Sequence, residues 1–166
     1  MPMNCIKITF TGIVQGVGFR PFIFNLANRL HIRGSVTNTG DGVNIVAYGK
    51  ADALLRFSRC IQEEAPPLSR ISSITSSPTE SDQVPDDFTI LISSSTTPAT
   101  TGIPPDVALC ADCLAELLSP TDKRFGYPFI NCTNCGPRFT IVNTIPYDRP
   151  GTSMSVFTMC PTCSKE

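Results

Sequence analysis

Six of the eight cysteines in this 166-residue sequence form three Cys-x-x-Cys pairs near its end: Cys110/Cys113, Cys132/Cys135 and Cys160/Cys163. A Cys-x-x-Cys turn directs two thiolates to one side of a metal ion, and two such turns complete a tetrahedral zinc site. The first two pairs are separated by 18 residues, a spacing found in zinc ribbons and related fingers. The sequence therefore predicts a structural zinc ion held by four cysteines: Cys110, Cys113, Cys132 and Cys135.

The third pair, Cys160/Cys163, has no fourth pair to complete it, so it predicts an incomplete second zinc site. Chance thiols, disulfides and a redox dithiol are the alternatives for these cysteines. The redox alternative normally requires one exposed pair on a thioredoxin-like βαβ unit, and no such pattern surrounds these pairs. Four protein ligands would also leave the first metal with no open position for catalysis.

A glycine-rich loop near the N-terminus is the second candidate for chemistry. It consists of Gln15, Gly16, Val17, Gly18, Phe19 and Arg20. Two glycines let successive backbone N–H groups turn inward to bind an anion, and a following helix would add its positive N-terminal dipole. The Arg20 guanidinium can hydrogen-bond a phosphate with two N–H groups. The loop lacks the Gly-Lys-Ser/Thr of a P-loop, so it favours phosphate over a nucleoside triphosphate. A glycine-rich turn with a surface arginine is the alternative.

The elements that would position this loop follow from hydrophobic periodicity. Alternation predicts strands and helical spacing predicts helices. In chain order they are a strand at 6–10, a helix from Pro21, two strands within 34–48 joined at Asp41-Gly42, a helix through 54–61, a weak strand at 70–76 and a strand at 88–92. The order β-α-β-β-α-β, with an extra strand at the end, predicts an α+β, ferredoxin-like fold: an antiparallel sheet with both helices on one face.

Composition divides the chain further. Residues 93–105 are rich in Ser, Thr and Pro and predict a linker between residues 1–92 and a zinc finger at 106–150. Residues 151–166 would be the first half of a second, truncated finger. The net charge of −1 and the absence of basic blocks argue against a nucleic-acid partner. No apolar run is long enough for a membrane span, and no signal peptide is recognisable. We therefore expect a cytoplasmic protein.

The segment QGVGFRPF, followed by Asn38 in VTNTGDG, resembles the acylphosphatase family across residues 4–92. The resemblance implies that Arg20 binds the phosphate of the substrate and that Asn38 orients the attacking water. Positioning and charge stabilisation can suffice here, because an acyl phosphate has a good leaving group. Read without the family, an asparagine near a hairpin turn is more often simple turn chemistry.

Residues 127–150, together with the first cysteine pair, resemble the HypF-type carbamoyltransferases. In that family an acylphosphatase domain precedes two four-cysteine fingers and further domains. The resemblance implies hydrolysis of carbamoyl phosphate, or another acyl phosphate, as the first step of carbamoyl transfer to the C-terminal cysteine of a HypE partner. That product leads to the cyanide ligands of nickel–iron hydrogenases. The alternative is a non-catalytic module that binds phosphate or carbamoyl phosphate and uses its zinc finger for docking.

Overall fold

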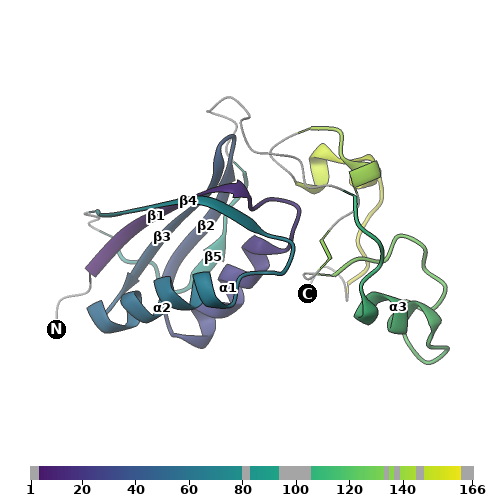
Figure 1. Cartoon of the computed structure of the whole chain (residues 1–166), viewed down its shortest axis with the longest axis horizontal. Helices are drawn as coiled ribbons and strands as arrows, with labels where there is room; N and C mark the ends of the chain where they lie inside the picture. The colour runs from purple at the N-terminus through teal and green to yellow at the C-terminus, as the bar shows by residue number, and fades with distance from the viewer. Residues whose placement is uncertain are drawn as a thin grey trace.

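The computed structural model describes residues 4–79, 83–93, 106–132, 135–136, 139–144 and 148–161. They form two parts that lie side by side: a helix-covered sheet, and a smaller part made mostly of turns (Figure 1). Of the predicted linker 93–105, only Ser93 belongs to the described residues. None of the described helices is long and apolar enough to cross a membrane.

The larger part is a five-stranded sheet with the order β4-β1-β3-β2-β5. Its strands are β1 (Asn4–Ile13), β2 (Arg33–Thr39), β3 (Gly42–Gly49), β4 (Arg70–Pro78) and β5 (Phe88–Ile90). The predicted element order is confirmed, and the weak strand at 70–76 is a full edge strand paired with β1. The expectation of a wholly antiparallel sheet is wrong at one edge, where β5 pairs parallel to β2. The reason is geometric: a chain that returns from β4 to the opposite edge of the sheet runs in the direction of β2.

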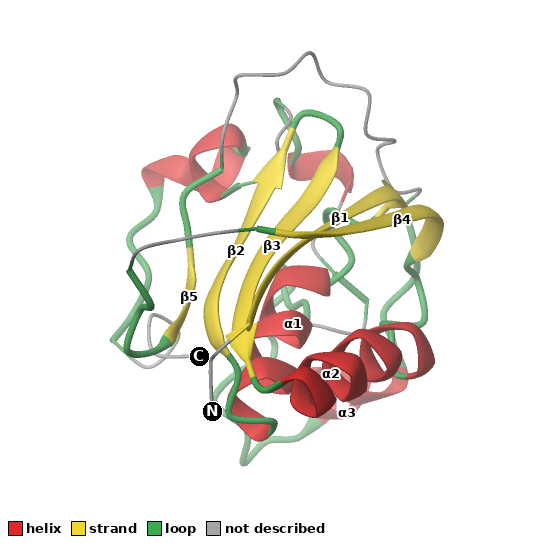
Figure 2. Ribbon diagram, turned by 90° about the vertical axis from the view of Figure 1, so that its left-hand side faces the viewer, coloured by secondary structure: helices red, strands yellow, loops and turns green. Residues whose placement is uncertain are grey.

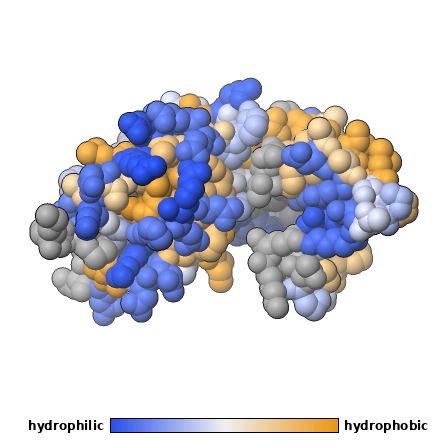
Figure 3. Space-filling model, turned by 90° about the horizontal axis from the view of Figure 1, so that it is seen from below, coloured by the Kyte–Doolittle hydropathy of each residue, from blue (hydrophilic) through white to orange (hydrophobic). Residues whose placement is uncertain are grey.

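Two helices, α1 (Phe19–Arg29) and α2 (Ala51–Glu63), cover one face of this sheet (Figure 2). Alternation along β3 turns Val43, Ile45 and Ala47 toward the helices, where all three are buried. From α2, Phe57 enters the same core and meets Phe88 of β5 edge-on. The outer face of the helices is mainly hydrophilic (Figure 3), as the amphipathic spacing of both segments requires.

Helix α1 ends in a Schellman motif that contains a strained residue. Ile32 N–H donates to the Ala27 carbonyl at 2.9 Å, and His31 N–H donates to the Asn28 carbonyl at 3.2 Å. His31 therefore takes a left-handed conformation, with φ of 53°, at a position where glycine is usual. This motif turns the chain from α1 directly into β2.

Among its described residues, the smaller part contains one regular helix, α3 (Ala111–Leu118), and three short 3-10 turns. These turns are η1 (Phe139–Ile141), η2 (Arg149–Gly151) and η3 (Ser153–Val156). A bridge between Val142 and Thr152 joins the segments that hold them. The small core around Ile130 and the cysteines is completed by Leu68 from the α2–β4 loop. The expectation that turns and short segments dominate this region is confirmed, and the partly buried Leu68 also contacts the separate core of the larger part.

Candidate functional site

The glycine-rich loop has the backbone conformation that an anion-binding nest requires. Gly16 and Gly18 have φ values of 70° and 75°, in the left-handed region that side chains disfavour. Both glycines are partly exposed, whereas the side chains of Val17 and Phe19 are buried in the core. The alternating sequence therefore anchors the loop through two apolar side chains and presents its backbone outward. Val17 and Phe19 could contact an anion only through their N–H groups.

The loop leads directly into the N-terminus of α1, which begins at Phe19. Its N-cap residue is Gly18, which has no side chain with which to cap the first helical N–H groups. The first backbone bond of the helix runs from the Phe22 N–H to the Gly18 carbonyl at 3.1 Å. The positive end of α1 thus follows directly on the two glycines, and a helix N-terminus of this kind can bind phosphate and other anions.

Gln15 ties this loop to the β2–β3 hairpin. Its side-chain amide donates to the carbonyls of Thr39, at 2.7 Å, and Gly42, at 2.8 Å. Both hydrogens of the Nε2 group are therefore engaged by backbone, and Gln15 is 3% exposed. Gln15 therefore connects the glycine-rich loop to β2, the strand that carries Asn38, through its side-chain hydrogen bonds.

Asn38 lies near the end of β2, opposite Val43 of β3 and one residue before Thr39. Its side chain is enclosed, with 1% of its surface exposed. Because Gln15 bonds the adjacent Thr39, the loop and Asn38 are neighbours in space although separate in sequence. Sequence reasoning placed Asn38 on a strand beside the hairpin turn, and the structure agrees with that placement.

Arg20, in the first turn of α1, is held by a residue that sequence reasoning missed. Its Nη2 lies 2.6 Å from Oδ1 of Asp148, which directly precedes η2 in the smaller part. Its Nη1 donates to Oγ of Ser93 at 3.4 Å, and the Ser93 N–H donates to Oδ2 of Asp148 at 3.3 Å. No local pattern identifies Asp148, because its role depends entirely on how the two parts pack.

The first two cysteine pairs come together as predicted. The Sγ atoms of Cys110, Cys113, Cys132 and Cys135 all lie within 4.8 Å of one another. The Cys110–Cys132 and Cys113–Cys135 pairs are separated by 3.5 and 3.6 Å, and Cys132–Cys135 by 3.8 Å. A tetrahedron of thiolates with metal–sulfur bonds of ~2.3 Å has edges of about 3.8 Å, so this geometry fits a metal bound by four cysteines.

Local structure explains how each pair turns toward the metal position. Cys110 is the N-cap of α3, and its sulfur accepts the N–H of Cys113 at 3.5 Å. In the second pair, the Gly136 N–H donates to the Cys132 carbonyl at 2.8 Å, and Gly136 has a φ of 64°. Each turn therefore exposes two sulfurs on one side, with glycine supplying the left-handed residue of the second.

The electrostatics of the cluster favour a cation at its centre. Burial raises the pKa of the Cys113 thiol above its usual range, and the neighbouring cysteine sulfurs raise it further because a second negative charge beside them is unfavourable. Burial also opposes ionisation of Cys135, but hydrogen bonds with the Cys132 backbone and the Cys113 side chain lower its pKa to about 7. One thiolate forms readily, and the others require a compensating positive charge.

Cys160 does not join this group. It is exposed and stands outside the four-cysteine cluster, while Cys163 lies outside the described residues. All seven cysteines within the described residues are thiols, so no disulfide forms among them.

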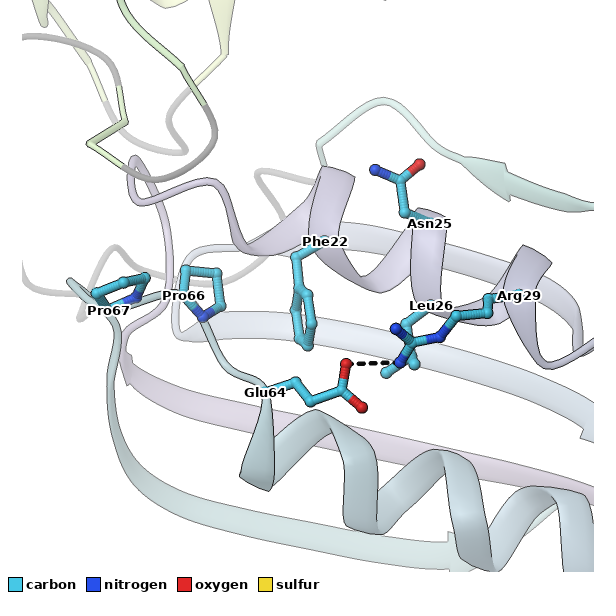
Figure 4. Close-up of a pocket in the computed structure, with 7 residues that line it drawn as sticks. All are labelled: Phe22, Asn25, Leu26, Arg29, Glu64, Pro66 and Pro67. Carbon is cyan, nitrogen blue, oxygen red and sulfur yellow. Dashed lines mark hydrogen bonds and ion pairs between the residues drawn. The ribbon is translucent and has the colours of Figure 1, made fainter. Parts of the chain in front are cut away.

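A separate hollow of about 330 Å³ lies between α1 and the segment that follows α2 (Figure 4). Phe22 and Leu26 point into it from α1, and an ion pair of 2.6 Å between Arg29 and Glu64 crosses it. Neither Arg20 nor Asn38 lines this hollow. This hollow is therefore distinct from the glycine-rich loop at the N-terminus of α1, where the sequence predicts phosphate binding.

Comparison with known families decides what the two parts are. The acylphosphatase family model matches residues 6–90, and the HypF finger model matches residues 109–142. The chain belongs to the acylphosphatase family. Its sheet is an acylphosphatase domain, an enzyme domain, and a HypF finger follows it. The acylphosphatase of Thermotoga maritima is 39% identical over 89 residues, which are 53% of this chain and 97% of that protein.

Similarity to HypF proteins extends over both parts. Carbamoyltransferase HypF2 of Cupriavidus necator is 47% identical over 156 residues, covering 93% of this chain and 19% of that protein. The crystal structure of full-length HypF in its phosphate- and nucleotide-bound form matches with a TM-score of 0.90 and 44% identity, over 99% of this chain and 22% of that one. The acylphosphatase of Bacillus subtilis matches the sheet alone, with a TM-score of 0.50 and 32% identity over 53% of this chain and 98% of that one. This chain spans about a fifth of the length of the HypF relatives it matches.

Proposed function

We propose that the acylphosphatase domain binds carbamoyl phosphate, or another acyl phosphate, and hydrolyses it at the N-terminus of α1. The observation that carries this proposal is the pair of hydrogen bonds from Gln15 to Thr39 and Gly42. These bonds hold the anion-binding nest beside Asn38. A phosphate site and a polar group able to position water are thereby adjacent, as hydrolysis of an acyl phosphate requires.

In the proposed reaction, the nest N–H groups and the Arg20 guanidinium hold the phosphate. The amide of Asn38 orients a water molecule toward the acyl carbon. Attack by that water and departure of phosphate yield the free acid, carbamate in the case of carbamoyl phosphate. The enclosed position of Asn38 favours one ordered water over bulk solvent. Binding energy and orientation then accelerate the reaction without a strong base.

We further propose that zinc is the metal of the HypF finger, with structure as its role. Four cysteine sulfurs leave no coordination position for a substrate, and soft thiolate ligands suit zinc. Because Cys160 stands apart from the cluster, we expect about one zinc ion per chain of these 166 residues, measured by elemental analysis. Two ions per chain would require a further site that involves Cys160 and Cys163. Four reduced thiolates suit the cytoplasm, which we retain as the proposed location.

In the context of the longer relatives, we propose that this hydrolysis is the first step of HypF-type carbamoyl transfer to the C-terminal cysteine of a HypE-type partner. The similarity over 93% of this chain to a protein named carbamoyltransferase HypF2 supports that role. These 166 residues match about a fifth of the length of those relatives, so we expect them by themselves to carry out only the hydrolysis.

Release of phosphate from carbamoyl phosphate and from acetyl phosphate tests the proposal. The variants Arg20→Ala and Asn38→Ala should each lose at least ~100-fold in kcat/KM. Arg29→Ala and Asn25→Ala are matched controls, because these residues lie on the same helix but border the separate hollow. They should keep wild-type activity. Phosphate binding that depends on Arg20, without turnover of either compound, would instead identify the non-catalytic binding module.

A further inference from the structure

The smaller part of the chain touches the glycine-rich loop at two points. Gly136, in the HypF finger and next to the metal ligand Cys135, lies so close to the loop that a side-chain carbon on it would overlap the Gly16 carbonyl. Asp148, which lies beyond the matched finger residues 109–142, forms the ion pair with Arg20. The anion site of the acylphosphatase domain is therefore bordered by a second structural unit, which the single-domain acylphosphatase relatives do not share over their matched length.

The contacts of Asp148 form a closed ring around the end of Arg20. One carboxylate oxygen accepts from the guanidinium at 2.6 Å, and the other accepts the Ser93 N–H at 3.3 Å. The hydroxyl of Ser93 returns to the second terminal nitrogen of Arg20 at 3.4 Å. Because both carboxylate oxygens are engaged, Asp148 fixes the orientation of the guanidinium plane as well as neutralising its charge.

The surroundings of this ion pair distinguish it from an ordinary surface pair. The side chains of Arg20 and Asp148 are 18% and 25% exposed. The pair Arg29–Glu64 has the same separation of 2.6 Å, but its side chains are 57% and 41% exposed. Because a partly desolvated pair is less screened by water and salt, the Asp148 contact restrains its arginine more strongly.

We propose that Asp148 is a positioning residue for phosphate binding, by which the segment that follows the HypF finger orients Arg20 for the nest. This inference rests on the proposed phosphate-binding role of Arg20. A restrained plane can meet phosphate oxygens without first ordering a long flexible side chain, an ordering that weakens binding. The opposing effect is repulsion between the Asp148 carboxylate and the phosphate. If positioning dominates, replacing Asp148 weakens phosphate binding; if repulsion dominates, it tightens phosphate binding.

Calorimetric titration of the 166-residue chain with inorganic phosphate, at fixed salt and pH, tests this role. Asp148→Ala should weaken phosphate binding roughly tenfold, the change expected for losing an oriented charge-assisted hydrogen bond. Asp148→Asn keeps the shape of the side chain and the contact with the Ser93 N–H, so it provides a second test if the alanine variant misfolds. Asp148→Asn should weaken phosphate binding by a smaller factor. Glu64→Ala, which removes the partner of Arg29, should leave phosphate affinity unchanged. A metal content equal to that of the wild type shows that the finger is intact in each variant.

A spectroscopic readout separates positioning from general stability. The Nε–Hε resonance of Arg20 should be sharp in the wild type and broadened in Asp148→Asn, while that of Arg29 stays the same. Phosphate binding that is equal or tighter in both Asp148 variants overturns the proposal, as does a wild type that binds no phosphate. Failure of the proposed function is a different result: phosphate binding that depends on Arg20 and Asp148, with neither acyl phosphate hydrolysed.

Discussion

Loss of the metal should unfold the HypF finger and leave the acylphosphatase domain folded. Apart from cysteines, Ile130 is the only buried hydrophobic side chain among the described residues of the finger. Burial of such a side chain contributes about 1.5–3 kcal/mol. Four cysteine ligands on zinc contribute an apparent ~10–16 kcal/mol at neutral pH. The metal therefore exceeds this one buried side chain severalfold as a source of stability, and Val107, Leu109 and Leu117 add only partly buried apolar surface.

The acylphosphatase domain has its own core, which extends from β1 through both helices to Phe88. Nothing in that core depends on the cysteine cluster except the contact of Leu68, which is only partly buried. We therefore expect two separable unfolding transitions, of which only one responds to a chelator. A chain with two such units is not two-state, so each transition must be followed by its own probe.

The decisive comparison uses two buried cysteines. Cys113, 0% exposed, belongs to the cluster, whereas Cys60, 8% exposed, lies in α2. Cys113→Ser should reduce the metal content from about one per chain to none and make the finger sensitive to protease. Cys60→Ser should retain the metal, because it alters only the core of the acylphosphatase domain. The measurements are elemental analysis, limited proteolysis and urea denaturation followed by circular dichroism.

Two outcomes would refute this reasoning. A Cys113→Ser variant that retained one metal per chain would show that the cluster is not the metal site. Collapse of both units together on chelation would show that the contact through Leu68 is a shared core and not a boundary.

Three further substitutions test the local geometry through the urea midpoint. Gly18→Ala should lower stability by about 1–2 kcal/mol and weaken phosphate binding, because its φ of 75° disfavours a side chain; an unchanged midpoint would contradict this. His31→Gly should raise stability by up to about 1 kcal/mol, since it relieves a φ of 53° at an exposed position, whereas a loss would point to an unrecognised contact of the imidazole. The hydrogen bond from Arg29 holds the pKa of Glu64 below its usual value, so the contribution of the pair is present above the unfolded-state pKa and disappears as pH falls through the folded-state pKa. Glu64→Gln should accordingly flatten the acid side of the stability profile; a profile as steep as that of the wild type would assign the acid sensitivity to other carboxylates.

Periodicity was sufficient for most of the sheet because its strands alternate cleanly. Ile8 and Phe10 of β1 are both buried, as alternation requires. The end of the final strand, β5, was predicted less well. The sequence extended it to Ile92, but β5 ends at Ile90, and Ile92 is 93% exposed. An edge strand has one neighbour, so apolar alternation there does not ensure pairing, and its parallel direction follows from the path of the chain across the sheet.

The sequence predicted the conformation of the glycine-rich loop only in part. Its two glycines indicated left-handed backbone, and the structure has that backbone at Gly16 and Gly18. The sequence treated Gln15 as part of the phosphate loop, yet its side chain bonds the β2–β3 hairpin. Long-range hydrogen bonds of this kind depend on which strands become neighbours, and a local pattern contains no such information.

By itself, the sequence determined which four cysteines form a cluster and which glycines take left-handed backbone, since both features are built from residues a few positions apart whose turn chemistry is local. Only the tertiary structure decided that the cysteine cluster and the glycine-rich loop are connected. Asp148 reaches Arg20, and Gly136 lies against Gly16, because the smaller part of the chain packs on the N-terminal end of α1. The physical reason is that a charge or a close backbone contact acts over a few ångströms of space, irrespective of the length of chain between the two groups.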